Sequence, residues 1–214
     1  MIGFDLTAEQ KALQEKARRF AKEIIFPVAA KHDRDGTFPL DIMEKAHAEG
    51  FLTPLVPKEY GGGGLGILDV CLTSEELAAA DMGIFVSIFV STLALYPIIK
   101  FGTGDQKNRF LKPFCEKFTL ASYCLSEYHV GSDPASMETT ATQDGDHYVL
   151  NGTKMWITNG GYANFYLVFA SVERQKKHKG IISLIVPATF PGIRHGQPID
   201  KMGQRASNTT AVTF

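Results

Sequence analysis

The sequence predicts an α+β protein of two domains: an all-helical domain over residues 1–119, then an antiparallel β domain, a barrel or a sandwich, over residues 120–214. Three observations favour this fold. Apolar residues recur at helical spacings of three and four in the first half. From about Leu120 the chain changes to short β-branched and aromatic runs. Dipeptides typical of tight turns separate those runs.

The first predicted helix carries apolar residues every three or four positions from Leu13 to Val28. Thr7 and Gln10 precede it with the spacing of a capping box, in which each side chain bonds the other residue's backbone N–H. Glycine and proline residues between the later apolar segments mark helix ends. These segments predict further helices over residues 40–49, 68–80, 84–96 and 105–117.

In the second half, the dipeptides Asp144-Gly145, Asn151-Gly152 and Asn159-Gly160 are typical of two-residue hairpin turns. The runs between and around them are rich in Val, Ile, Thr, Tyr and Phe, which favour strands. The sequence therefore predicts strands over residues 120–125, 137–143, 147–152, 154–159, 164–172, 180–186 and 211–214.

Composition excludes several classes of function. Lys and Arg number 22 and Asp and Glu number 23, so the net charge of −1 does not favour nucleic-acid binding. The three cysteines are widely spaced, which indicates free thiols. The six histidines lack metal-ligand spacing, so no metal site is expected. The run Gly61–Gly66 fits a GxGxxG pattern, but no strand precedes it, which favours a helix connection over a nucleotide loop.

Residues 83–99 are nearly long enough and apolar enough to cross a membrane. Because Ser87, Ser91, Thr92 and Pro97 interrupt them, we expect a buried helix and no membrane span. The first ten residues lack the basic and apolar regions of a secretory signal.

Two stretches remain that combine hydroxyl groups with glycines at strand ends: YCLSEYHVGSD at 123–133 and MWITNGG at 155–161. Together with five other segments, they identify a resemblance that runs through nearly the whole chain. These segments are GDHYVLNGTKMWITNGG, KMGQRAS, FPVAAKHDRDGTFP, VPKEYGG and SEEL. The sequence resembles the acyl-CoA dehydrogenases, and is most similar to the medium- and short-chain type. The resemblance covers the N-terminal and middle domains of that family.

The resemblance implies FAD as cofactor and assigns it to two segments. In the second segment, Trp156 would cover one face of the flavin and the Thr158 hydroxyl would bond near N5. In the first, Ser126 would bond the pyrimidine side, and Ser132 would contact both FAD and acyl-CoA. From the residues alone, a hydroxyl that caps its own turn is favoured at each position, and the resemblance reverses that preference. The full implied FAD set is Tyr123, Cys124, Leu125, Ser126, Gly131, Ser132, Trp156, Ile157 and Thr158.

The implied reaction is α,β-dehydrogenation of fatty acyl-CoA to trans-2-enoyl-CoA, with electron-transfer flavoprotein as acceptor. A dimer or tetramer is implied for the full-length protein, in the bacterial cytoplasm or the mitochondrial matrix. The family's base is a glutamate in a C-terminal four-helix domain, which we expect this chain to lack. We therefore assign no catalytic residue, Glu127 included, and expect the chain alone to be inactive. The alternative is a non-catalytic module that binds flavin or acyl-CoA, or acts as a scaffold.

One segment departs from the family's pattern. Tyr128, His129 and Val130 stand where the family commonly has a proline and two small residues. If the loop required a positive φ angle at His129, its side chain would strain the backbone and weaken FAD binding.

Overall fold

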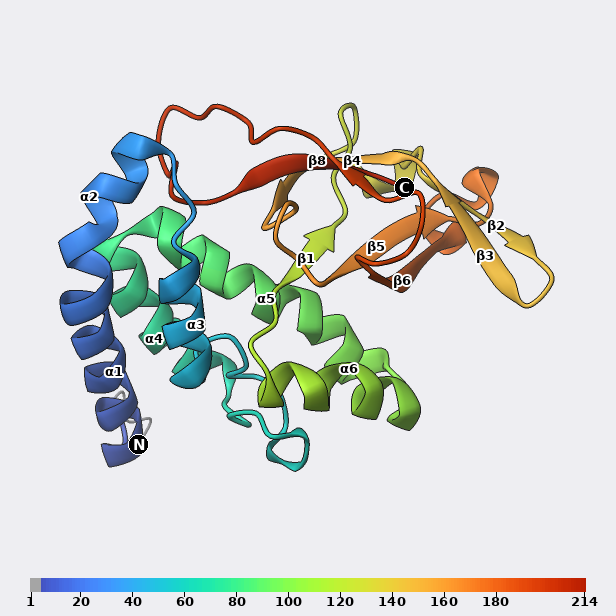
Figure 1. The fold of residues 1–214 in the computed structure, drawn as a ribbon. Coiled ribbons are helices and arrows are strands. Elements are labelled where there is room, and N and C mark those ends of the chain that lie inside the picture. The colour runs from blue at the N-terminus through green and yellow to red at the C-terminus, as the bar shows by residue number, and fades with distance from the viewer. Residues whose placement is uncertain (1–4) are drawn as a thin grey trace. The chain divides into compact units, whose positions relative to one another are not determined.

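The computed structural model describes residues 5–214 (Figure 1). The chain divides into two compact units. The helical unit contains the residues up to Thr92 together with Tyr96–Phe118 and Lys201–Ser207. The sheet unit contains Leu93–Leu95, Thr119–Asp200 and Asn208–Phe214. The predicted order, helical part first and sheet part second, is confirmed.

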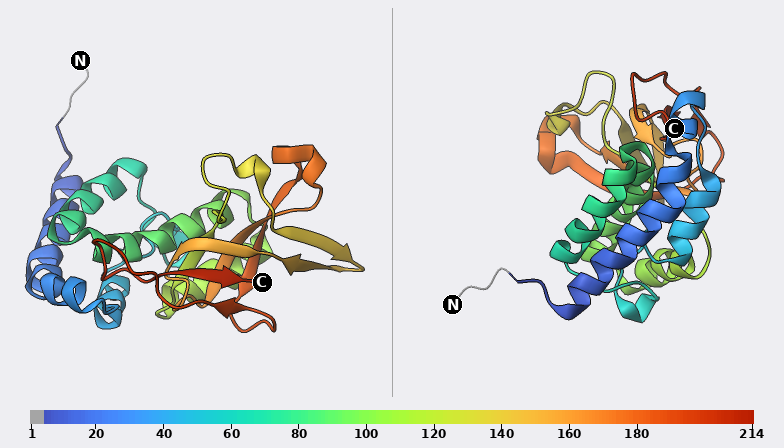
Figure 2. Two further views of the ribbon diagram at one scale, coloured as in Figure 1. Left: turned by 90° about the horizontal axis from the view of Figure 1, so that it is seen from above. Right: turned by 90° about the vertical axis from the view of Figure 1, so that its left-hand side faces the viewer.

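The helical unit begins with helix α1, Ala8–Phe20, which passes through a π-helical turn, Ala21–Ile25, into α2, Phe26–Asp35. The capping box is confirmed: Gln10 N–H donates to the Thr7 hydroxyl at 3.2 Å, and Thr7 N–H donates to the Gln10 side chain at 3.1 Å. Ala17 and Ile25 are fully buried on the apolar face. Helices α1 and α4 lie side by side (Figures 1 and 2).

The later helices are α3, Leu40–Ala48; α4, Ile67–Ala80; α5, Met82–Phe101; and α6, Gly104–Glu116. Helix α5 is longer than predicted, because it continues through Pro97. By length and composition α5 is the one described helix able to cross a membrane, with a mean hydropathy of 2.1. However, 56% of its most apolar stretch is buried within the protein, as in the core helix of a soluble protein.

The glycine run follows a short 3-10 turn, Lys58–Tyr60, and no strand precedes it in the part of the chain described. A Cβ atom on Gly62 would lie 2.3 Å from Val56, so the backbone there approaches its neighbour too closely for any side chain. Close packing therefore accounts for this glycine.

Residues 201–207 belong to the helical unit and contact α2. The Asp33 carboxylate accepts from Arg205 N–H at 2.8 Å and from Arg205 Nη2 at 2.9 Å. Arg205 Nε also donates to the Asp33 carbonyl at 2.7 Å. Arg205 thus fastens this segment to the last turn of α2.

The sheet unit contains two sheets. One has the order β1-β5-β2-β3, with β6 also paired to β5, and the other has the order β4-β8-β7. The prediction of a wholly antiparallel domain is wrong, because β1 pairs with β5 in parallel. The strands are β1, Ala121–Cys124; β2, Thr140–Asp144; β3, His147–Asn151; β4, Thr153–Thr158; β5, Phe165–Ser171; β6, Ile181–Pro187; β7, Arg194–His195; and β8, Thr209–Thr213.

Of the three predicted hairpin turns, only Asp144-Gly145 joins a hairpin, β2 with β3 (Figure 2). The other two predictions are wrong. After Asn151-Gly152 the chain enters β4, and after Asn159-Gly160 it enters β5, and each time it changes sheet. Asn159 adopts a φ of 60° and its N–H donates to Asn208 O at 2.9 Å, which fixes the crossing.

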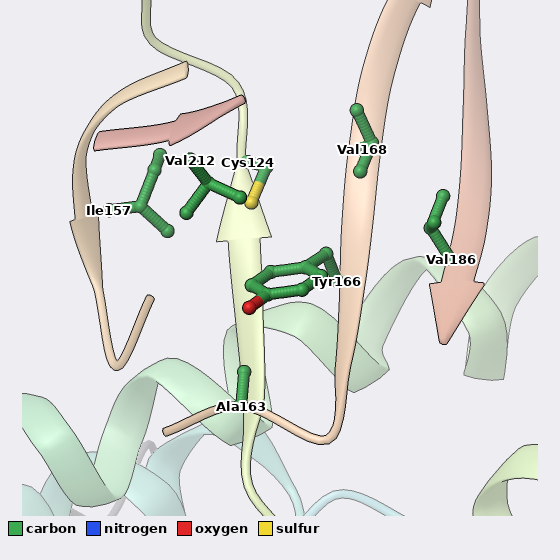
Figure 3. Close-up of a cluster of buried hydrophobic side chains, with 7 residues drawn as sticks. All are labelled: Cys124, Ile157, Ala163, Tyr166, Val168, Val186 and Val212. Carbon is green, nitrogen blue, oxygen red and sulfur yellow. The ribbon is translucent and has the colours of Figure 1, made fainter. Parts of the chain in front are cut away.

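One apolar core joins the two sheets (Figure 3). Tyr166 of β5 is 2% exposed, and its hydroxyl donates to Gly160 O at 2.8 Å. Side chains from both sheets therefore pack as in a sandwich, and the described strands form no closed barrel. The core residues are Cys124, Ile157, Ala163, Tyr166, Val168, Val186 and Val212.

Candidate functional site

The two segments singled out in the sequence lie side by side in the sheet unit. Met155 N–H donates to Ser126 O at 2.9 Å, which joins the loop after β1 to strand β4. The Ser122 hydroxyl donates to Thr158 O at 2.8 Å and ties β1 to the end of the same strand. Backbone and side-chain bonds thus bring together residues about 30 positions apart in the chain.

Trp156 is turned outward by an irregularity in β4. The register against β8 shifts between Lys154 and Ile157, and Trp156 has a φ of 57°. Lys154 and Ile157 are both buried, whereas Trp156 is 49% exposed. Its ring stacks on that of Tyr128, with 6.3 Å between ring centroids and an angle of 17°. A bulky residue with positive φ is uncommon and marks a functional candidate.

Three hydroxyl groups of the site have no protein partner among the described residues: those of Ser126, Ser132 and Thr158. Ser126 and Thr158 are half-buried, and Ser132 is exposed. The Ser126 N–H has no partner in the described chain either. Free donors on segments that also carry an exposed aromatic ring suit a planar ligand rich in hydrogen-bond acceptors.

Other residues of the predicted FAD set point elsewhere. Cys124 and Ile157 are 0% and 2% exposed and lie in the core, so their side chains are not available to a ligand. Burial raises the pKa of the Cys124 thiol above its usual range. Tyr123 is half-buried against Phe169, with 5.0 Å between ring centroids. Gly131 lies in the exposed loop.

An ion pair that was not anticipated lies beneath the site. Lys154 Nζ lies 2.8 Å from Glu127 Oε1, and their side chains are 0% and 4% exposed. Lys154 also donates to Leu125 O at 3.0 Å, and Glu127 accepts from the N–H groups of Glu138 and Thr139. The one signal in the sequence was a lysine inside a strand otherwise rich in apolar residues.

Electrostatics keep Glu127 ionised. Burial by itself would raise the pKa of its carboxyl, but the hydrogen bonds from Lys154, Thr139 and Glu138 outweigh burial, and the pKa lies below its ordinary value. Both carboxylate oxygens are occupied by these donors. Glu127 is thus a buried structural anion and is not positioned to accept a substrate proton.

The loop from Glu127 to Val130 is a tight turn without backbone strain at His129. Glu127 N–H donates to Val130 O at 2.8 Å, and Val130 N–H donates back to Glu127 O at 3.2 Å. The described non-glycine residues with positive φ are Trp156, Asn159, Lys177 and Gln204, and His129 is not among them. The concern that His129 strains this loop is therefore removed.

Comparison with known proteins gives two family matches. Residues 7–117 match the family described as "Acyl-CoA dehydrogenase, N-terminal domain", and residues 122–214 match "Acyl-CoA dehydrogenase, middle domain".

Individual proteins agree with these matches. A probable medium-chain specific acyl-CoA dehydrogenase of Caenorhabditis briggsae is 36% identical, over 100% of this chain and 53% of that protein. The short-chain specific enzyme of Mus musculus is 39% identical, over 98% and 51%. The structure of butyryl-CoA dehydrogenase from Megasphaera elsdenii matches with a TM-score of 0.94 and 33% identity, over 100% and 57%. The chain spans about half the length of the curated relatives it matches.

Proposed function

Because the chain belongs to the acyl-CoA dehydrogenase family, we propose that it forms the flavin-holding part of an enzyme that dehydrogenates acyl-CoA thioesters. The finer assignment is oxidation of a fatty acyl-CoA to its trans-2-enoyl-CoA, with FAD as the hydride acceptor. Dehydrogenation between Cα and Cβ needs such an acceptor, and a bound flavin supplies it.

The observation that carries the proposal is the set of unpartnered donors next to Trp156. Ser126 and Thr158 lie on neighbouring segments joined by the Met155–Ser126 bond, and their hydroxyls are free to bond the flavin. Trp156 presents about half of its surface beside them, where its indole would exclude water and oxygen from one flavin face. Ser132, exposed in the adjoining loop, is proposed to contact acyl-CoA as well.

Family membership supports further parts of the proposal. The electrons pass to an electron-transfer flavoprotein, and the working protein is a dimer or tetramer. The two curated relatives are named as mitochondrial, which favours the matrix if this chain comes from a eukaryote. A bacterial chain would act in the cytoplasm.

The test uses the complete product of the gene, purified and freed of FAD. We expect it to bind FAD and the flavin to lose its visible absorption when acyl-CoA is added without oxygen. Ser126→Ala and Thr158→Ala should each weaken FAD binding by about tenfold, the effect of one lost hydrogen bond. Thr142→Ala, at an exposed hydroxyl of β2, is the matched control and should leave binding unchanged.

Three outcomes are separable. Bleaching by acyl-CoA supports the enzyme. Bound flavin that no acyl-CoA reduces would favour the non-catalytic module. A protein that binds no flavin would refute the proposal.

A further inference from the structure

We propose that Lys154 is a positioning residue of the flavin site, which fixes the peptide between Leu125 and Ser126 so that the Ser126 N–H is presented to the flavin. The proposal rests on the proposed function, since it assigns a ligand to that N–H. Lys154 itself is fully buried and would not touch the flavin.

The orientation of the peptide unit between Leu125 and Ser126 is the first observation that supports this role. Lys154 Nζ donates to Leu125 O at 3.0 Å. No peptide bond in the described chain is cis, and in a trans peptide the C=O and N–H groups point in opposite directions. With the Leu125 carbonyl turned toward the ammonium, the Ser126 N–H is turned away from it. That N–H has no partner among the described residues.

The peptide units that follow are fixed by other bonds. Ser126 O accepts from Met155 N–H at 2.9 Å, and Glu127 N–H donates to Val130 O at 2.8 Å. The Glu127 N–H is therefore occupied within the protein. Of these successive amides, the one at Ser126 is left free to donate to a ligand.

The ion pair explains how Lys154 stays in place. Glu127 holds the ammonium at 2.8 Å and is itself fixed by the N–H groups of Glu138 at 2.6 Å and Thr139 at 2.9 Å. A buried pair contributes little net stability, because desolvation offsets most of the attraction, and apolar side chains would pack as well. Apolar side chains would not supply a donor to the Leu125 carbonyl. That donor is the property that distinguishes Lys154 from a packing residue.

Two variants of the complete gene product separate positioning from stability. Lys154→Met and Glu127→Gln both break the ion pair, so both should lower the thermal midpoint. Only Lys154→Met removes the donor to Leu125. We expect Lys154→Met to weaken FAD binding by about tenfold relative to Glu127→Gln, equivalent to ~1.4 kcal/mol. Equal FAD affinities in the two variants, or unaltered affinity in Lys154→Met, would overturn the proposal.

A second measurement uses the unaltered protein, so that it stands even if Lys154→Met fails to fold. On titration with FAD, followed by NMR, the Ser126 amide proton should shift strongly as it gains an acceptor. The Glu127 amide, already bonded to Val130, is the internal control and should shift little. FAD binding without a shift at Ser126 would refute this inference alone, whereas no FAD binding at all would refute the proposed function and the inference together.

Discussion

The contact between Asp33 and Arg205 predicts how firmly residues 201–207 are held. Asp33→Ala removes the acceptor of two hydrogen bonds, from Arg205 N–H at 2.8 Å and from Arg205 Nη2 at 2.9 Å. The side chains of Asp33 and Arg205 are 31% and 36% exposed, so water weakens each bond. We assign about 1 kcal/mol to each, below the range for buried charged groups, and about 2 kcal/mol in total.

Limited proteolysis measures this loss directly. Trypsin cleaves after Lys201, whose ammonium donates to Ser207 O, so we expect cleavage only when the segment opens. A loss of about 2 kcal/mol raises the open population by about 30-fold, and the cleavage rate at Lys201 should rise in proportion. Mass spectrometry of the fragments would follow that one bond.

Two matched variants calibrate the result. Asp33→Asn keeps an oxygen for the Arg205 N–H but loses the charge, so its cleavage rate should lie between those of Asp33→Ala and the unaltered chain. Asp35→Ala removes an exposed carboxylate from the same helical turn and should change little. If Asp33→Ala is cleaved at Lys201 no faster than Asp35→Ala, the contact does not hold the segment, and the estimate fails.

Three further predictions concern the sheet unit. Trp156→Ala should weaken FAD binding and speed reoxidation of the reduced flavin by oxygen, and unchanged values of both would reduce the indole to a structural role. Tyr166→Phe leaves Gly160 O buried without its donor and should lower the free energy of unfolding by about 1–3 kcal/mol, measured in urea. Because the folded-state pKa of Glu127 lies below its ordinary value of 4.5, its stabilisation is present above pH 4.5 and is lost as pH falls through the folded-state pKa. Acid should therefore destabilise the unaltered protein more than Glu127→Gln, and identical acid profiles would contradict this assignment.

Local patterns predicted the helices well, because each is defined by residues close in sequence. The Thr7–Gln10 capping box and the periodicity after it both correspond to α1. Proline was a less reliable signal, since α5 continues through Pro97. Helix existence is a property of a short window, whereas the exact end depends on packing from elsewhere.

Strand pairing was less predictable, because it depends on distant partners. The dipeptides Asn151-Gly152 and Asn159-Gly160 are turn signals, yet they redirect the chain between sheets instead of closing hairpins. The parallel pairing of β1 with β5 joins segments more than 40 residues apart, which no local pattern reveals.

The candidate site, too, was predictable where it depends on local sequence and unpredictable where it depends on distant partners. The resemblance located the segments around Ser126 and Trp156, and the structure places them side by side. The alternation of apolar and polar residues along β4 would not have predicted that Lys154 is buried. Its burial depends on the ion pair with Glu127, which lies 27 residues earlier in the chain. Nor did the sequence indicate that Tyr128 stacks on Trp156.

The left-handed backbone at position 156 and the proposed flavin site favour different residues there. At a φ of 57°, glycine, asparagine and aspartate are the residues that fit with least strain. A library of all twenty amino acids at position 156, sorted for thermal stability without cofactor, should enrich glycine and asparagine over tryptophan. The same library sorted for retained flavin should enrich tryptophan. Opposite rankings would mean that this position was shaped by the ligand at the expense of the fold.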